Sequence, residues 1–266
     1  MRRLEGCHAL VTGASAGIGR EFARQLCERA ATLVLVARRK ERLEELRAEL
    51  LERNPRLQVE IHPVDLSQPD AVAELLAWAT TRKPAIDLLI NNAGLGDLGA
   101  FATADAERIG RMMSVNMAAL TLLTRGFLPA MIAQKRGAIL NVSSAASFLP
   151  IANFAVYAAT KAYVTSFSEA LRSELRGTGV GVTALCPGPV KTEFAEVARR
   201  DGRGEIPGSG LAYVSVEAVV ADGLRGLDRD RAIVIPGALM KLGMTLVRLT
   251  PRALLRLANR FTAKQA

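Results

Sequence analysis

Short apolar runs alternate with longer amphipathic segments along most of the chain. Apolar runs of strand length occupy residues 8–13, 32–38, 57–65, 86–94, 137–144, 180–188 and 232–237. Between them, apolar residues recur at helical spacing over residues 18–29, 40–53, 70–82, 105–134, 155–176 and 216–227. We expect the segment 105–134 to form a pair of helices. The pattern predicts seven strands that alternate with helices.

This alternation favours a parallel sheet, because a strand, a helix and a further strand in succession form a right-handed crossover. The predicted strands are apolar on both faces, as in sheets that helices cover on both sides. We therefore expect an α/β fold, a Rossmann-type doubly wound seven-stranded parallel sheet with helices on both faces, formed by residues 1–237 as one domain. Such sheets bind ligands at the carboxyl ends of their strands. Residues 238–266 form a separate C-terminal tail.

Charge is distributed unevenly along the chain. Its 266 residues include 35 Lys and Arg against 26 Asp and Glu, a net charge of +9. Such an excess would suit nucleic acid, an anionic membrane or an anionic small molecule. Seven basic residues and no acidic one fall in 231–266, which leaves 28 basic and 26 acidic residues in 1–230. Because the main domain is nearly neutral and has no recognisable nucleic-acid-binding motif, we expect no nucleic-acid partner.

Cysteine, histidine and targeting signals are sparse. The cysteines Cys7, Cys27 and Cys186 form no C-x-x-C pair, and we expect them to be buried and reduced. With only two His in the chain, we expect no metal site. The N-terminus lacks the apolar segment of a signal peptide, and the uncharged stretch 137–160 contains too many polar residues for a membrane span. We therefore expect a cytoplasmic protein.

A glycine-rich turn lies between the first predicted strand and the first helix. Its residues 12–19, TGASAGIG, have the spacing G-x-x-x-G-x-G. Glycine allows a tight turn close to a pyrophosphate, and the N–H groups at a helix N-terminus bind anions. A purely structural turn is the alternative. We expect a dinucleotide to contact the turn at Gly13, Ser15, Ala16, Gly17, Ile18 and Gly19.

The end of the second predicted strand indicates which dinucleotide binds. NAD sites usually carry an acidic residue there for the ribose hydroxyls, whereas this strand ends in Arg38 and Arg39. A guanidinium group suits the 2′-phosphate of NADP(H). We therefore predict NADP(H) as the cofactor, with Arg38 as its main contact and Arg39 as the second, unless both are only solvated residues at a helix start. Asp65 and Leu66, after the third strand, would lie beside the adenine.

The string YAATK places Tyr157 and Lys161 four residues apart, on one face of a predicted helix. A free tyrosine has a pKa of about 10, and a neighbouring ammonium group favours tyrosinate, so we expect Lys161 to lower the pKa of Tyr157. Such a pair can donate or accept a proton, although the spacing alone is common. Ser144, at the end of the fifth strand, could hold a substrate oxygen with its hydroxyl.

Together these motifs resemble those of the short-chain dehydrogenase/reductase family. TGASAGIG, NNAG at 91–94, Asn116, NVSS at 141–144, YAATK and PGPVKT at 187–192 match the family in order and spacing over residues 6–237. Arg38 is similarly placed in the NADP(H)-preferring members. The resemblance implies an NADP-dependent carbonyl reductase that transfers hydride between nicotinamide C4 and a carbonyl or hydroxyl carbon. It also implies a homodimer or homotetramer that pairs through helices near 112–133 and 155–176.

The resemblance further implies a role for each matched residue. Tyr157 would be the general acid/base, Lys161 would lower its pKa and bind the nicotinamide ribose, and Ser144 would orient the carbonyl group. Asn116 would hold a kinked helix and a water that extends the proton relay. The other cofactor contacts that it implies are Asn91, Ala93, Gly94, Pro187, Gly188, Val190 and Thr192.

Substrate specificity in this fold lies in loops, chiefly residues 191–214 after the sixth strand, which we expect to form a mobile lid. The expected pocket is apolar and suits an apolar ketone, aldehyde or acyl chain, unless half of these residues only pack in the core. Its walls would be Ser144, Leu95, Gly96, Phe148, Leu149, Ile151, Phe154 and Phe194. A non-catalytic NADP(H)-binding sensor or scaffold protein is the alternative function, and the intact set of catalytic residues argues against it.

The C-terminal tail has a basic amphipathic pattern. We expect glycines and prolines, Gly243 among them, to interrupt it, and a helix to begin at Thr250 and Pro251. Beyond that point, apolar residues form one face, and basic residues recur every four positions at Arg252, Arg256, Arg260 and Lys264. Three interpretations remain open: packing on its own domain, peripheral contact with a membrane surface, and contact with another subunit.

Overall fold

The computed structural model describes residues 4–200, 213–251 and 253–255. Its centre is a parallel sheet of seven strands in the order β3-β2-β1-β4-β5-β6-β7. The strands are β1 (Cys7–Thr12), β2 (Ala30–Ala37), β3 (Gln58–Pro63), β4 (Leu88–Asn91), β5 (Gly137–Val142), β6 (Val180–Leu185) and β7 (Ile233–Val234). The predicted fold class is therefore confirmed.

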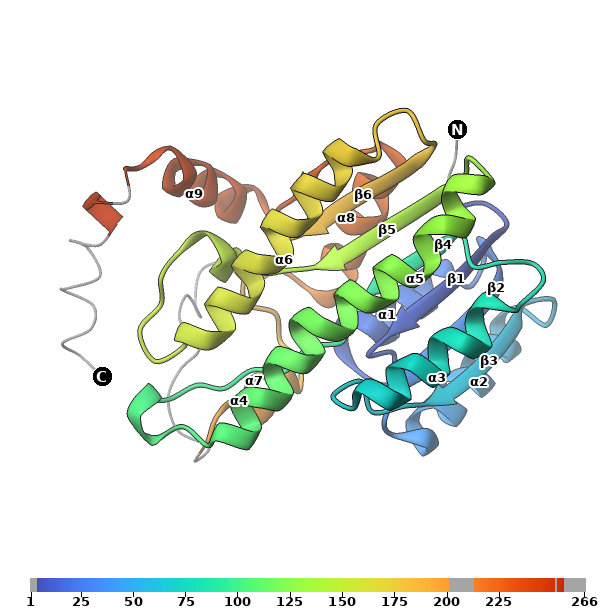
Figure 1. Ribbon diagram of the computed structural model, residues 1–266, viewed down its shortest axis with the longest axis horizontal. Coiled ribbons are helices and arrows are strands. Elements are labelled where there is room, and N and C mark those ends of the chain that lie inside the picture. The colour runs from blue at the N-terminus through green and yellow to red at the C-terminus, as the bar shows by residue number, and fades with distance from the viewer. Residues whose placement is uncertain (1–3, 201–212, 252, 256–266) are drawn as a thin grey trace.

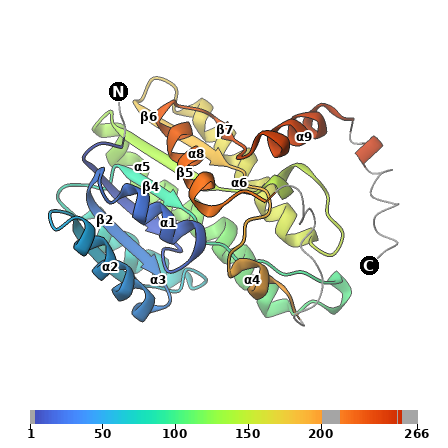
Figure 2. The same ribbon diagram turned by 180° about the vertical axis from the view of Figure 1, so that it is seen from behind.

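Helices cover both faces of this sheet (Figures 1 and 2). One layer contains α1 (Gly17–Leu26), α2 (Lys40–Arg53) and α8 (Val216–Asp228), and the other contains α3 (Pro69–Thr80), α5 (Leu120–Ala133) and α6 (Ala155–Glu174). Each layer has its own apolar core, with Phe22 and Leu46 on one face and Leu75 and Phe127 on the other. The strands are buried between two apolar layers, which explains why they lack alternating polar residues. The three cysteines are buried and unpaired, as predicted.

The strand order reverses at β1, which pairs with β2 on one side and with β4 on the other. The connections that leave the carboxyl ends of β1 and β4 run to opposite faces of the sheet, so a crevice opens between them. Thr12, at the end of β1, accepts hydrogen bonds at Oγ1 from the backbone N–H groups of Asn92 and Ala93, both at 3.0 Å. The crevice is thus held at a fixed width by a side chain of the sheet itself.

Residues 106–133 form one continuous helix instead of the expected pair. It comprises α4 (Ala106–Met113), a wider π-helical segment (Ser114–Ala119) and α5. The π segment changes the hydrogen-bonding pattern without breaking the helix, which is why the sequence pattern did not separate one helix from two. The helix is long and apolar enough to cross a membrane, with a mean hydropathy of 1.4. Its inner face, with Leu123 and Phe127, instead packs on the sheet as part of the core.

Four shorter or later helices complete the described chain. They are the 3-10 turns η1 (Phe101–Thr103) and η3 (Ala145–Phe148), α7 (Phe194–Ala198) and α9 (Ala238–Leu249). The prediction that Gly243 breaks the tail was wrong, because α9 runs through it; one glycine in an exposed helix costs only about 1 kcal/mol. Of the predicted lid, residues 201–212 lie outside the described residues, as do 252 and 256–266 of the predicted basic helix.

Candidate active site

A cavity of about 1230 Å³ runs along the carboxyl ends of the strands, from the glycine-rich turn to α9. Most of the predicted site residues line it, although they come from distant parts of the chain. The lining includes Gly13, Ser15, Ala16, Gly17, Ile18, Arg38, Arg39, Asp65, Leu66, Ala93, Gly94, Leu95, Gly96, Ser144, Leu149, Ile151, Phe154, Tyr157, Lys161, Pro187, Gly188, Val190, Thr192 and Phe194. Gly19, Asn91, Asn116 and Phe148 are not part of this lining.

The glycine-rich turn owes its shape to contacts that leave no room for side chains. Gly13 has a φ of +67°, and a Cβ atom there would lie 2.7 Å from Asn92 Nδ2. A Cβ atom on Gly19 would lie 2.2 Å from the carbonyl oxygen of Gly13, so Gly19 supports the turn from behind. Ala16 is the N-cap of α1 and has no side chain that could cap the helix. The first N–H groups of α1 therefore remain available to an anion in the cavity.

The two arginines after β2 have different surroundings. Arg39 donates to Glu193 Oε2 at 2.9 Å and to Ser15 Oγ at 3.3 Å, and Arg42 holds the other oxygen of Glu193 at 2.9 Å. Arg38 is exposed at the edge of the cavity, close to Asp65. Burial opposes ionisation of Asp65, but hydrogen bonds from Ser67 and the charge of Arg38 outweigh it and lower the pKa of this carboxyl group. Two guanidinium groups thus flank the turn.

Tyr157 and Lys161 both face the cavity from α6 and are almost fully buried. Phe154 stacks on the Tyr157 ring at 4.2 Å between ring centroids, and Phe194 contacts the same ring at 5.4 Å. Lys161 Nζ donates to the carbonyl oxygen of Val142 at 2.9 Å and lies 5.7 Å from the centre of the Tyr157 ring. These contacts fix the phenol and the amine beside the end of β5.

Burial dominates the ionisation of this pair. It raises the pKa of Tyr157 to about 12, although a hydrogen bond with Ser144 acts in the opposite direction. It lowers the pKa of Lys161 from 10.5 to about 8. We expected Lys161 to lower the pKa of Tyr157; burial instead raises this pKa, and Lys161 is not among the groups that shift it. Both groups lie away from water, where each charged form is disfavoured, and the amine is directed at a backbone carbonyl.

Ser144 and Ser143 are adjacent in the chain but differ in what they contact. Ser144 lines the cavity beside Tyr157, where it acts to lower the pKa of the phenol, and it caps η3 by accepting from Ala146 N at 3.1 Å. The hydroxyl of Ser143 instead lies behind the cavity, 2.8 Å from the carbonyl oxygen of Lys161 and 2.7 Å from Thr165 Oγ1. Ser143 therefore fixes α6 against β5, and Ser144 presents its hydroxyl next to the tyrosine.

Asn116 lies in the π-helical segment and holds the loop after β4. Its Oδ1 accepts from Leu95 N at 2.8 Å, and its Nδ2 donates to Leu95 O at 2.9 Å and to Thr160 Oγ1 at 3.0 Å. The hydroxyl of Thr160 donates in turn to the carbonyl oxygen of Tyr157 at 2.8 Å. Asn116 thus positions both the cavity wall and α6, and the wider π turn is what brings its side chain to them.

Two neighbouring asparagines at the end of β4 have separate roles. Asn91 is buried in the sheet, where its Nδ2 donates to Asn141 Oδ1 at 2.9 Å and to Thr124 Oγ1 at 3.0 Å. Asn92 lines the cavity and donates to the carbonyl oxygen of Thr12 at 2.9 Å, which ties β4 to the glycine-rich turn. Asn91 was predicted from the sequence as a cofactor contact, whereas Asn92 was not. The doubled asparagine directly after an apolar strand was the available signal.

The far end of the cavity is formed by segments that the sequence analysis only partly identified. Met240 and Met244 of α9 line it, as does Tyr213. Phe148, predicted to bind substrate, instead lies under the guanidinium group of Arg248, 5.5 Å from its ring centre. The methionines were missed because nothing in their local pattern distinguishes a pocket wall from an ordinary helix face.

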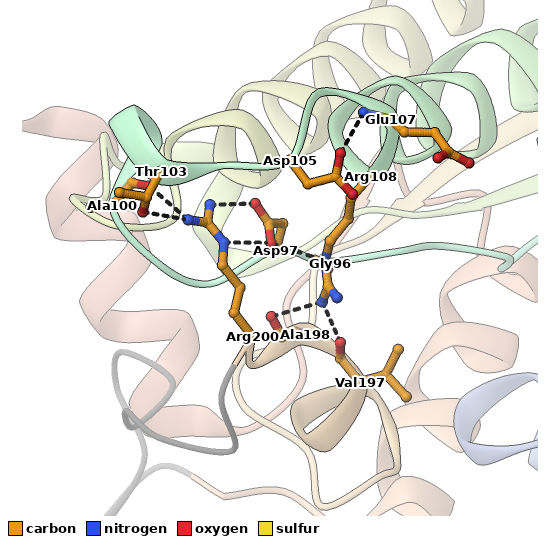
Figure 3. Close-up of polar contacts among 10 residues, drawn as sticks. All are labelled: Gly96, Asp97, Ala100, Thr103, Asp105, Glu107, Arg108, Val197, Ala198 and Arg200. Atoms are coloured by element: carbon orange, nitrogen blue, oxygen red, sulfur yellow. Dashed lines mark hydrogen bonds and ion pairs between the residues drawn. The ribbon is translucent and has the colours of Figure 1, made fainter.

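The segment after α7 is attached to the main domain through one buried carboxylate (Figure 3). Asp97 accepts from Arg200 at 2.9 and 2.6 Å and forms an ion pair with Arg108 Nε of α4 at 2.9 Å. Arg200 also donates to Ala100 O at 2.7 Å, and Arg108 donates to Ala198 O at 3.2 Å. The hydrogen bonds from Arg200 lower the pKa of Asp97 despite its burial. This Asp97 anchor holds residues 194–200 over the cavity.

Comparisons with known proteins identify the family. The model of the short chain dehydrogenase family matches residues 7–202. The NADP-dependent 3-hydroxy acid dehydrogenase YdfG of Salmonella typhi is 37% identical over 215 residues, which cover 80% of this chain and 84% of that protein. The very-long-chain 3-oxooacyl-coA reductase let-767 of Caenorhabditis elegans is 35% identical over 204 residues, which cover 74% of this chain. That match covers only 64% of let-767, less than two thirds of its length.

Solved structures give the same result. A short-chain dehydrogenase from Sphingobium yanoikuyae in complex with NADPH aligns with a TM-score of 0.80 at 34% sequence identity. The alignment covers 87% of this chain and 88% of that structure. With the sheet order, the glycine-rich turn and the paired Tyr157 and Lys161 in one cavity, these matches show that the chain belongs to the short-chain dehydrogenase/reductase family of oxidoreductases.

Proposed function

We propose that the protein is an NADP(H)-dependent oxidoreductase that interconverts the carbonyl and hydroxyl groups of an apolar ketone, aldehyde or acyl substrate. One observation carries this proposal. A single cavity joins the anion-binding turn at α1 to the Ser144, Tyr157 and Lys161 side chains. A dinucleotide with its phosphates at the turn would extend along the cavity toward these side chains, where a substrate carbonyl has a hydroxyl donor within reach.

The residues present fit NADP(H) as the cofactor. The uncapped N-terminus of α1 would receive the pyrophosphate, and Arg38 and Arg39 would hold the 2′-phosphate. Arg39 already donates hydrogen bonds to Glu193 and to Ser15 of the turn, so Arg38 is the guanidinium group more available to a phosphate. Asp65 and Leu66 would flank the adenine. NADPH or NADP dependence is also stated in the names of YdfG and of the Sphingobium yanoikuyae structure.

The chain's own residues supply the proton chemistry. When bound, NADPH supplies a hydride to the carbonyl carbon. Because burial raises the pKa of Tyr157 to about 12, its phenol keeps its proton at neutral pH and can donate it to a substrate oxygen. Ser144, which lines the same cavity, would orient the same oxygen. Lys161 and Asn116 would keep the phenol and the cavity wall in place, and Lys161 would bind the ribose.

The substrate end of the cavity favours an apolar molecule. Its walls include Leu149, Ile151, Phe154 and Phe194, and Met240 adds a flexible apolar side chain from α9. Val197 and Tyr213 extend the same surface toward solvent. The names of the relatives support carbonyl or hydroxyl chemistry on acyl compounds, but they describe different substrates. We infer a substrate with an apolar chain beside the reacting carbonyl group.

Consumption of NADPH with ketones of graded chain length tests this proposal. We expect kcat/KM to rise with chain length, because longer chains would bury more apolar surface against the α9 methionines. The same series with NADH in place of NADPH tests the cofactor. No turnover with any carbonyl compound, together with tight NADPH binding, would contradict the proposal and favour the sensor function.

The subunit arrangement is a further part of the proposal. The outer faces of α5 and α6 expose Leu122 and Tyr163, and Tyr163 hydrogen-bonds Thr121 across the two helices at 2.8 Å. We propose a homodimer or homotetramer that pairs through these faces. Light scattering of the wild type and of Leu122→Arg checks this, since a buried arginine at that face should dissociate the assembly.

A further inference from the structure

Helix α9 is apolar on two opposite sides. Met240, Met244 and Val247 are half-buried, and the two methionines line the substrate end of the cavity. Leu239, Leu242, Leu246 and Leu249 recur at i, i+3, i+7 and i+10, which places them together on the other side. Their exposed fractions are 63%, 60%, 58% and 77%, and no residue of α9 is buried. We call these four side chains the leucine face.

This exposure does not result from a loosely placed helix. Gly188 has no side chain at the point where Met240 packs, since a Cβ there would lie 2.5 Å from Met240 Cε. Arg248 reaches Glu169 of α6 at 3.7 Å and covers the ring of Phe148. Figures 1 and 2 show α9 at the margin of the molecule, to one side of α6. The helix is therefore anchored by one side and presents four leucines outward.

The charge around the leucine face identifies what would cover it. Residues 231–266 contain seven basic residues and no acidic one. A second copy of the chain docked on α9 would bring two such basic segments together, and residues 231–266 contain no acidic residue that could pair with them. An anionic lipid surface suits both the basic charge and the leucine face. Its headgroups attract the cationic side chains, and the leucines can be buried in its acyl region.

We propose that α9 docks on the surface of an anionic lipid bilayer through the leucine face, so that the substrate end of the cavity opens beside the membrane. The methionines on the inner side of the same helix would then form the wall past which an apolar chain leaves the bilayer. This inference rests on the proposed function and names its substrate more closely, as a membrane-dissolved carbonyl compound. The apolar contact with the membrane would then lie on α9, which precedes the segment after Thr250 that the sequence pattern indicated.

Flotation of the purified full-length protein with vesicles tests the docking. One set of vesicles contains phosphatidylcholine and phosphatidylglycerol, and the other contains phosphatidylcholine alone. We expect the wild type to float with the first set, more weakly with the second, and less at high salt. The double variant Leu242→Gln/Leu246→Gln keeps good helix formers on the surface and should reduce partition by about tenfold or more.

Thr245→Gln is the matched control, because Thr245 is exposed on the polar side of the same helix. It should float like the wild type. A double variant that floats as well as the wild type, or a wild type that does not float with the anionic vesicles, would overturn the proposal. A fall in the oligomeric mass of the double variant would also overturn it, since a second copy would then cover the leucine face.

Activity measurements separate this inference from the function on which it rests. Turnover of a short, water-soluble ketone without vesicles should be the same in the double variant and the wild type. Turnover of a long-chain ketone dissolved in anionic vesicles should fall in the double variant alone. Because flotation requires neither cofactor nor turnover, its failure contradicts the docking only. A complete lack of turnover contradicts the proposed function and the substrate named here, and leaves the docking of α9 in place.

Discussion

The two ends of the cavity are constructed in different ways. At the cofactor end, the wall consists of strand ends and a turn whose backbone atoms touch one another, as at Gly13 and Gly19. At the substrate end, the wall consists of α7 and α9. One backbone hydrogen bond, from Leu98 N to Ala198 O at 2.8 Å, holds the end of α7, but both helices also depend on long side chains such as Arg200 and Arg248. Backbone packing leaves few alternatives, whereas side-chain ion pairs can be exchanged at little cost. The chemistry thus lies on the sheet, and specificity lies on elements added to it.

The largest effect that this comparison predicts is at the sheet side of the cavity. Tyr157→Phe removes the proton donor and keeps the ring that stacks on Phe154, so kcat/KM for ketone reduction should fall by about 1,000-fold. NADPH affinity, measured by fluorescence titration, should change little. The matched control is Tyr163→Phe on the same helix, which keeps the ring at the proposed subunit contact and loses only the hydrogen bond to Thr121. Activity in Tyr157→Phe comparable with that of the control would disprove the assignment.

The buried amine of Lys161 should be visible in the pH dependence of stability. Its pKa is about 8 in the folded chain and 10.5 ordinarily, so the unfolded chain binds more protons between these values. Burial of the ammonium group therefore lowers the free energy of unfolding by about 3 kcal/mol below pH 8. This penalty disappears as the pH rises from 8 toward 10.5. Urea unfolding of the wild type and Lys161→Met at pH 7 and at pH 10 measures this difference. A pH-independent difference would show that the amine is not desolvated.

Arg38 should determine whether the protein prefers NADPH or NADH. The expected effect of changing it is smaller than that of Tyr157→Phe. Arg38→Asp replaces a guanidinium group with a carboxylate beside the expected 2′-phosphate, so the ratio of kcat/KM for NADPH to that for NADH should fall by about 30-fold. Arg47→Asp makes the same change at an exposed position of α2 that is not part of the cavity lining, and should leave the ratio unchanged. Equal ratios in the two variants would assign the phosphate to Arg39 instead.

Sequence and structure agree best where function depends on local chemistry. The glycine-rich turn, Ser144 and the Tyr157–Lys161 pair were predictable because each motif lies in one short stretch directly after or beside a predicted strand. Glu193 on Arg39, Asp97 between two arginines, and the methionines of α9 were not predictable, because their partners lie far away in the sequence. The raised pKa of Tyr157 was missed for a related reason, since burial depends on the whole fold and not on the spacing of two residues.

The smallest predicted effect concerns the Asp97 anchor at the substrate side. Asp97→Asn keeps the size of the side chain but removes the charge that two guanidinium groups share, so residues 194–200 should lie less firmly over the cavity. We expect KM for the ketone to rise about tenfold while kcat and NADPH affinity change little, because the catalytic residues belong to other elements. Steady-state kinetics well below the unfolding temperature separate this effect from a general loss of stability.

Asp105→Asn provides the control for this anchor, because Asp105 is exposed nearby and caps α4 by accepting from Glu107 N at 2.9 Å, a role that asparagine also fills. The pH dependence gives an independent check. Since Arg200 lowers the pKa of Asp97 below its ordinary 3.8, the stabilisation is fully present above that value and is lost only as the pH falls through the lower value of the folded chain. A KM that stays constant in Asp97→Asn, or a fall confined to kcat, would mean that the anchor supports the fold without positioning residues 194–200.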